Sequence, residues 1–101
     1  MTRLVVTPEA DADASEILAY LYREAGARVA QDYNRRFQQT LQRLVARPLI
    51  GAPRRALGQD ARVAIVQPYL LIYSYTSDDD TLTLLRVLHG RRNITRGLLP
   101  Q

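Results

Sequence analysis

The stretch ARVAIVQPYLLIYSYTSDDDTLTLLRVLH (residues 61–89) contains three runs that are rich in β-branched, aromatic and leucine residues. Short turn signals separate the runs, namely Gln-Pro at 67–68 and Ser-Asp-Asp-Asp at 77–80. Runs of this composition, joined by turns this short, are typical of antiparallel strands. The stretch therefore predicts a three-stranded meander over residues 61–67, 69–76 and 81–89.

The residues before this meander predict one more strand and two helices. RLVV (3–6) is a short β-rich run, and Thr-Pro at 7–8 suits a helix N-cap followed by the first helical position. Apolar residues then recur at helical spacing in two segments, with Ala10, Ala14, Ile17, Leu18, Leu21 and Ala25 in the first and Ala30, Tyr33, Phe37, Leu41 and Leu44 in the second. Because Gly26 separates the segments and Pro48 ends the second, we expect a helix over 8–25 and a second helix packed antiparallel to it.

The order strand, helix, helix, then three strands indicates an α+β fold. We expect one curled sheet with the helical hairpin on one face. The other face is expected to be partly open, because an antiparallel sheet tolerates solvent on one side. Residues 47–60, with two prolines and two glycines, predict an ordered loop, and residues 90–101 read as a polar tail. The length predicts one domain over residues 1–101.

The amino-acid composition limits the classes of function that this chain can have. All 14 basic residues are arginine and 10 residues are acidic, which gives a formal net charge of +4. Guanidinium groups suit contacts with carboxylate or phosphate, and a lysine-free chain is equally typical of a high-GC genome. The absence of cysteine excludes disulfides and thiolate metal sites. With no membrane-length apolar run and no secretory signal pattern, we expect a cytoplasmic protein. Because the sequence has no glycine-rich phosphate loop and no metal-ligand cluster, we expect no cofactor and no metal.

The single histidine of the chain lies in LLRVLHGRR (84–92). His89 either acts as a general acid or base near neutral pH or caps the end of a strand, and we favour the structural role. Strict alternation along 81–89 separates the side chains into two faces, with Thr83, Leu85, Val87 and His89 on one and Leu82, Leu84, Arg86 and Leu88 on the other. Arg86 and His89 then point apart unless the strand bulges near Gly90, so a paired phosphate-cleaving site is not the expected geometry.

Arg86 interrupts a run of leucines in an inner strand, and Arg62 lies in a similar position at the start of RVAIV. An arginine there must reach solvent or meet a carboxylate, because an unpaired buried charge is unfavourable. Either these arginines pair with a carboxylate such as Asp60 or Glu16, or together they form an anion-binding floor on the open face of the sheet.

Three weaker patterns have simple structural interpretations. Arg54 and Arg55 lie in the predicted loop and form a basic patch that a partner can use. The aspartates at 78–80 lack the spaced ligands of a cation site and predict a solvated hairpin turn. The tyrosines of the strand at 69–76 have the spacing of core residues and predict packing rather than base stacking.

Four segments, in order and over nearly the whole chain, resemble the ParE-type toxins of the RelE/ParE superfamily. They are VTPEADADASEILAYL (6–21), AQDYNRRFQQTLQRLVARPLIGAP (30–53), RVAIVQPYLLIYSY (62–75) and LLRVLHGRRNI (84–94). The resemblance implies a RelE/ParE-like fold and the toxin half of a type II toxin–antitoxin system. It also implies a hetero-oligomer with a cognate antitoxin, ParD-like or related, whose acidic C-terminal segment wraps the toxin.

Members of this superfamily differ in their target: ParE-like toxins poison DNA gyrase, and RelE-like toxins cut messenger RNA in the ribosome. RVLHGRR resembles the gyrase branch, which implies a function without catalytic residues. Contacts to antitoxin or target are then expected from Arg54, Arg55, Arg62, Arg86, Arg91 and Arg92. An endoribonuclease would instead use Arg62, Arg86, His89 and Arg91. A non-catalytic nucleic-acid-binding module with phosphate contacts from these arginines is a third alternative.

Overall fold

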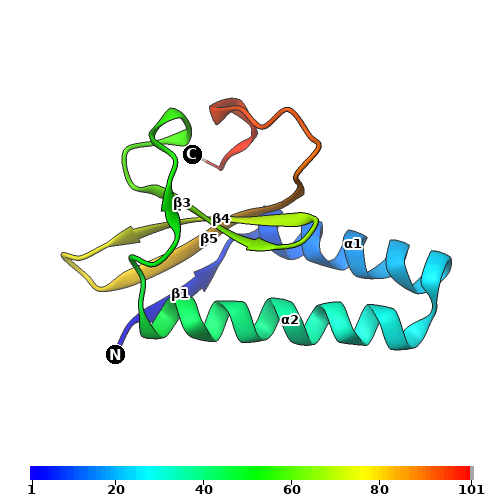
Figure 1. The fold of residues 1–101 in the computed structure, drawn as a ribbon. Coiled ribbons are helices and arrows are strands. Elements are labelled where there is room, and N and C mark those ends of the chain that lie inside the picture. The colour runs from blue at the N-terminus through cyan, green and yellow to red at the C-terminus, as the bar shows by residue number, and fades with distance from the viewer. Residues whose placement is uncertain (101) are drawn as a thin grey trace.

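The computed structural model describes residues 1–100 and contains one five-stranded sheet with two long helices (Figure 1). The elements, in chain order, are β1 (Arg3–Val6), α1 (Pro8–Ala25), α2 (Ala27–Ala46), β2 (Ala52–Pro53), β3 (Ala61–Val66), β4 (Tyr69–Thr76) and β5 (Thr81–His89), with short 3₁₀ helices η1 (Arg55–Leu57) and η2 (Arg96–Leu98). The spatial order of the strands is β1-β5-β4-β3-β2. β1 runs parallel to β5, and the other neighbours are antiparallel.

The predicted α+β class, the helical hairpin and the three-stranded meander are confirmed. The sheet has a fifth strand, β2, inside the segment that was predicted to be a loop. It is also open rather than curled, because its two edge strands are only four and two residues long and cannot close it. Within residues 1–100, no helix is both long and apolar enough to cross a membrane.

The helical hairpin begins and turns where the sequence predicts. The Thr7 hydroxyl accepts a hydrogen bond from the Ala10 amide at 3.0 Å and donates one to the Leu85 carbonyl at 2.9 Å. The N-cap of α1 is therefore fixed to the middle of β5. Gly26 separates α1 from α2 with a φ of 92°, a left-handed conformation that glycine adopts readily.

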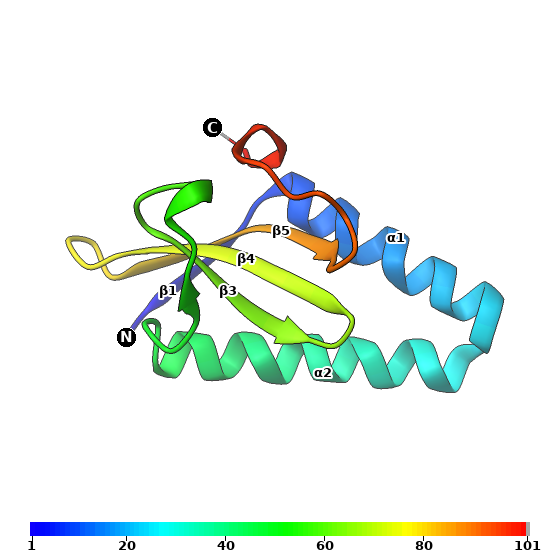
Figure 2. The same cartoon turned by 45° about the horizontal axis from the view of Figure 1, so that its top comes forward.

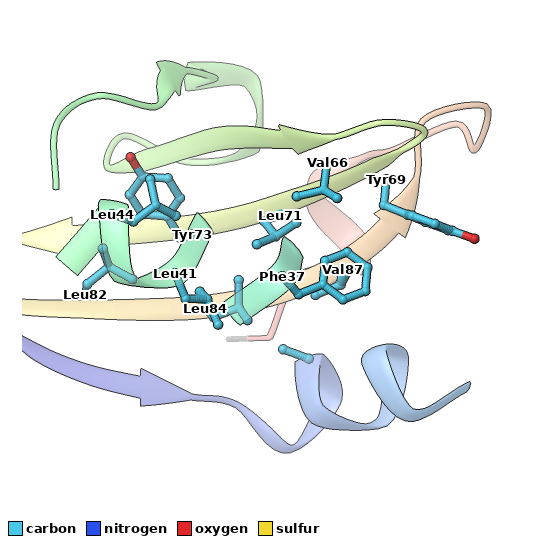
Figure 3. Packing of buried hydrophobic residues seen from close by; sticks show 11 residues of the cluster. Phe37, Leu41, Leu44, Val66, Tyr69, Leu71, Tyr73, Leu82, Leu84 and Val87 are labelled. Atoms are coloured by element: carbon cyan, nitrogen blue, oxygen red, sulfur yellow. The ribbon is translucent and has the colours of Figure 1, made fainter. Parts of the chain in front are cut away.

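The main core lies between the two helices and one face of the sheet (Figure 3). α2 supplies most of its helical side, whereas Ala10 is the one fully buried residue of α1. The predicted apolar residues Ile17, Leu18 and Leu21 are only partly buried at the edge of this core. The sheet side of the core consists of Val66, Tyr69, Leu71, Tyr73, Leu82, Leu84 and Val87.

The other face of the sheet is covered only in part, as predicted, because Ile65, which pairs with Leu70 on this face, remains 63% exposed. Figures 1 and 2 show η1 and the C-terminal segment on the side of the sheet opposite α2. A second core forms beneath them from Leu57, Ala61, Val63, Ile72, Leu88 and Leu99. The segment after His89 is therefore not simply a polar tail, because its few apolar residues, Ile94, Leu98 and Leu99, pack on the sheet.

β5 contains an irregularity that overturns the predicted alternation of its side chains. Ile72 pairs with Arg86 but Tyr73 pairs with Leu84, so Leu85 is an extra residue in the ladder. Leu82 and Leu84 face the helices before this bulge, and Val87 faces them after it. Leu85 and Leu88 instead contact the second core.

The acidic segment at 78–80 forms the predicted hairpin turn between β4 and β5. One carboxylate oxygen of Asp80 accepts hydrogen bonds from the Tyr75 hydroxyl at 2.7 Å and the Thr2 hydroxyl at 2.9 Å. These two hydrogen bonds lower the pKa of Asp80. The turn therefore also fastens the N-terminus of the chain beside β1.

Candidate functional site

Arg86 is held in an ion pair with Asp13 of α1. Its Nε and Nη2 atoms donate to the two carboxylate oxygens of Asp13 at 2.6 and 2.8 Å, and its Nη1 donates to the Leu98 carbonyl at 2.7 Å. The side chains of Arg86 and Asp13 are only 17% and 12% exposed. The hydrogen bonds from Arg86 to Asp13 raise the pKa of the guanidinium further. Arg86 is therefore not free to form the floor of an anion site.

The position of Asp13 follows from the short length of β1. β1 pairs with β5 only as far as Leu84, which leaves the following residues of β5 without a strand neighbour on that side. The Asp13 carboxylate accepts the Val87 amide at 3.0 Å, in place of a strand partner. The carboxylate expected beside the strand arginines was Asp60 or Glu16, and Arg86 pairs with neither of them.

Arg62 lies on β3, near the opposite edge of the sheet, and has a different structural role. Its Nη1 donates to the carbonyls of Leu49 and Gly51 at 2.9 and 2.8 Å and so holds the loop after α2. Arg62 pairs across the ladder with Tyr73 of the main core, whereas Arg86 pairs with Ile72 of the second core. Because cross-strand partners share a face, the two arginines lie on opposite faces and cannot form a common floor.

His89 lies exposed at the end of β5. Its Nδ1 accepts the Arg91 amide at 3.0 Å, and its ring stacks edge-on against Tyr69 with centroids 5.7 Å apart. His89 pairs with Tyr69 and Arg62 with Tyr73, which separates them by four residues of β4, or about 13 Å. Arg62, Arg86 and His89 thus do not converge.

The four other predicted contact residues are exposed. Arg54 and Arg55 lie at the start of η1, and Arg91 and Arg92 follow the end of β5. No ion pair within residues 1–100 involves any of them. They remain available for an anionic partner, in two groups on different parts of the surface rather than in one site.

A groove of about 620 Å³ separates α1 from the ends of β4 and β5. Its floor is apolar, with Ile17, Tyr69 and Val87, and charged residues at its rim include Glu16, Arg23 and Arg92. A second groove, of about 550 Å³, begins on the other side of His89 and extends to Ile65. An apolar floor between guanidinium groups suits binding of a polypeptide segment. Sequence reasoning missed the contribution of α1, for which the exposed Tyr20 at the groove was a signal.

The edge of β3 is a further feature that sequence reasoning missed. β2 pairs only with Arg62 and Val63, so β3 has no strand neighbour beyond Val63 on that side. Ile65, which is 63% exposed, and Ile50, which is 47% exposed, line one shallow groove there together with Arg43. An unpaired strand edge with exposed apolar side chains is a surface to which another strand can add.

Comparison with known proteins identifies the family. Residues 4–94 match the family described as "ParE toxin of type II toxin-antitoxin system, parDE". Two relatives named Toxin ParE1, from Mycobacterium tuberculosis strains CDC 1551 / Oshkosh and ATCC 25618 / H37Rv, are each 30% identical over 97 residues. Each alignment covers 96% of this chain and 98% of the relative.

Solved structures share the fold at lower sequence identity. A structure of the chromosomal ParDE system from P. aeruginosa superposes with a TM-score of 0.73 at 19% identity, over 88% of this chain and 96% of that chain. The isolated E. coli RelE toxin superposes with a TM-score of 0.63 at 15% identity, over 92% and 88% of the two chains. The fold is thus common to ParE and RelE structures, whereas the family match and the closer relatives carry the ParE name. This chain belongs to the ParE toxin family of type II toxin–antitoxin systems.

Proposed function

We propose that this ParE-family toxin acts in the cytoplasm by inhibiting DNA gyrase, without a catalytic site of its own, and that a cognate ParD-like antitoxin neutralises it. The alternative is a RelE-type endoribonuclease, which needs an acid, a base and cations gathered around one phosphate. The Asp13–Arg86 ion pair is the observation that favours gyrase inhibition over RNA cleavage, because it removes the central candidate cation from an endoribonuclease site. The separation of Arg62 from His89 supports the same choice.

Purified gyrase provides the direct test. The purified toxin is expected to block supercoiling of relaxed plasmid, and equimolar antitoxin is expected to restore it. The control is toxin mixed with antitoxin before gyrase is added. Normal supercoiling at saturating toxin would contradict the gyrase proposal.

His89→Ala separates the gyrase proposal from the RNase alternative. Because His89 is exposed and contacts mainly Tyr69, its removal is expected to leave the fold intact. Cells that express either the wild type or His89→Ala should arrest growth equally, within about a factor of two, with intact transcripts. Transcript mapping after induction measures this. Cleavage at ribosomal A sites by the wild type, abolished by His89→Ala, would favour the endoribonuclease.

We expect an extended segment of the antitoxin to bind along the free edge of β3. Strand addition supplies main-chain hydrogen bonds, Ile65 and Ile50 supply apolar contact, and Arg43 beside them favours an acidic partner.

Ile65→Asp is expected to weaken antitoxin binding, because it removes an apolar contact and adds a charge that repels an acidic segment. The dissociation constant from calorimetry should rise by about tenfold or more. Val6→Asp is the matched control, since Val6 is also an exposed apolar residue of an edge strand but lies on β1, at the opposite end of the sheet. Equal losses in both variants, or none in Ile65→Asp, would place the antitoxin elsewhere.

A further inference from the structure

The net charge of the molecule is concentrated on α2 and its C-cap residue, Arg47. Residues 27–47 carry five arginines and one aspartate, which alone give the formal net charge of +4. The nine arginines and nine carboxylates in the rest of the chain cancel. A helix and C-cap that together carry the whole charge excess of a domain create a local positive potential that attracts polyanions.

The charged residues of α2 lie on the side that faces solvent, except Arg36, which is half-buried and lies 4.7 Å from the centroid of the Tyr33 ring. Phe37, Leu41 and Leu44 are buried against the sheet. The opposite side consists of exposed polar residues that are almost all arginine or amides: Arg28, Gln31, Asp32, Asn34, Arg35, Gln38, Gln39, Gln42 and Arg43. Figures 1 and 2 both show α2 along one outer edge of the molecule, so this side is accessible.

The composition of this face favours a nucleic acid over a protein partner. None of the large exposed hydrophobic residues found in residues 1–100 lies on α2. Protein interfaces depend on apolar and aromatic anchors at their centre, which this face lacks except at its C-terminal end, where Arg43 borders the groove of Ile50 and Ile65. Guanidinium and amide donors are instead the groups that contact phosphate oxygens and base edges.

The shape of the helix favours duplex DNA over duplex RNA. α2 has 20 residues and is about 30 Å long, which is close to one turn of B-DNA. A straight helix at an outer edge can lie along the major groove of B-DNA, about 12 Å wide, between its two phosphate backbones. The major groove of an RNA duplex is too narrow and deep for this contact.

We propose that the outer face of α2 binds the backbone of duplex DNA, with phosphate contacts from Arg28, Arg35, Arg43 and Arg47 and no dependence on base sequence. The single acid of this face, Asp32, is paired with Arg35 at 2.9 Å and reduces the attraction. This inference goes beyond the proposed inhibition of gyrase and does not rest on it, because it concerns DNA itself.

Fluorescence anisotropy with the full-length toxin and a labelled DNA duplex of two turns, about 21 base pairs, tests the proposal. Four phosphate contacts predict a slope of log K against log salt of about −3 to −4 between 50 and 200 mM NaCl. Arg28→Gln/Arg43→Gln should flatten the slope to about −2 and weaken binding about tenfold. Arg3→Gln/Arg96→Gln, with the same net charge and both changes at exposed positions off α2, should change the affinity about twofold or less.

Asp32→Asn is the control for misfolding. It is expected to tighten DNA binding about two- to threefold, and a misfolded protein would not gain affinity. The proposal is overturned if the wild type does not bind at 50 mM NaCl, or if both double variants lose affinity equally. It is also overturned if an RNA duplex of the same length binds as tightly as DNA. A protein that inhibits gyrase but fails these tests would overturn this inference and leave the proposed function standing.

Discussion

Arg86→Met is expected to lower the free energy of unfolding by about 3 kcal/mol, because it leaves the Asp13 carboxylate buried without its cation. The substitution also removes the hydrogen bond to the Leu98 carbonyl, which fastens the C-terminal segment over the second core. Chemical denaturation followed by circular dichroism measures the loss.

The matched control is Arg35→Met, which breaks the ion pair with Asp32. That pair has the same chemistry, but its side chains are 63% and 53% exposed. Exposed pairs contribute little, so the control should lose no more than about 0.5 kcal/mol. Equal losses in the two variants would mean that the Asp13–Arg86 pair is as well solvated as a surface pair.

A second variant isolates the unpaired charge. In Asp13→Asn/Arg86→Met the amide oxygen can still accept the Val87 amide, and no buried charge remains. This double variant should be about 1 kcal/mol more stable than Arg86→Met alone. The comparison also bears on function. If an Arg86 variant loses toxicity, lost stability explains the result before the loss of a catalytic group does.

The parts of the fold that depend on local pattern were predictable. Thr7 and Pro8 fix the start of α1, and Gly26 separates the helices. Phe37 and Leu44 mark the buried side of α2. Each of these features acts within a few residues of the chain, so spacing alone reveals it.

The predictions that failed concern features that depend on contacts between residues distant in sequence. The pair Arg86–Asp13 spans 73 positions, and neither residue has a local signal that selects the other. The bulge at Leu85 could not be read from alternation, because apolar residues at 84 and 85 satisfy either face. The short β1 explains the position of Asp13, since its end at Val6 creates the unpaired segment of β5 that Asp13 covers.

The loop after α2 is another long-range feature, and it depends on one buried hydroxyl. The Tyr73 hydroxyl accepts the Gly51 amide at 2.9 Å and donates to the Pro48 carbonyl at 2.7 Å. Burial raises the pKa of this hydroxyl, which keeps it protonated as a donor. Figure 3 shows the Tyr73 ring beside Leu44, and no part of the residue is exposed. The ring therefore has no space into which it can withdraw.

Gly51→Ala is accordingly expected to destabilise the protein by about 3 kcal/mol, through overpacking and loss of the hydrogen bonds at Tyr73. A Cβ at position 51 would overlap the Tyr73 Oη and lie 2.7 Å from its Cε1. Gly97→Ala is the matched control, because its Cβ would come no closer than 3.8 Å to Thr95 Oγ1 and should change stability by less than about 0.5 kcal/mol.

Gly51→Ala/Tyr73→Phe tests the mechanism, since removing the hydroxyl relieves the tightest overlap but leaves the contact with Cε1. The double variant should therefore lose less than the sum of the two single variants, by at least about 1 kcal/mol, when the three are compared by denaturation. Strict additivity would show that the loop moves away from Tyr73 at little cost. In that case the Arg62 hydrogen bonds to the carbonyls of Leu49 and Gly51, rather than the Tyr73 hydroxyl, would hold this edge of the sheet in place.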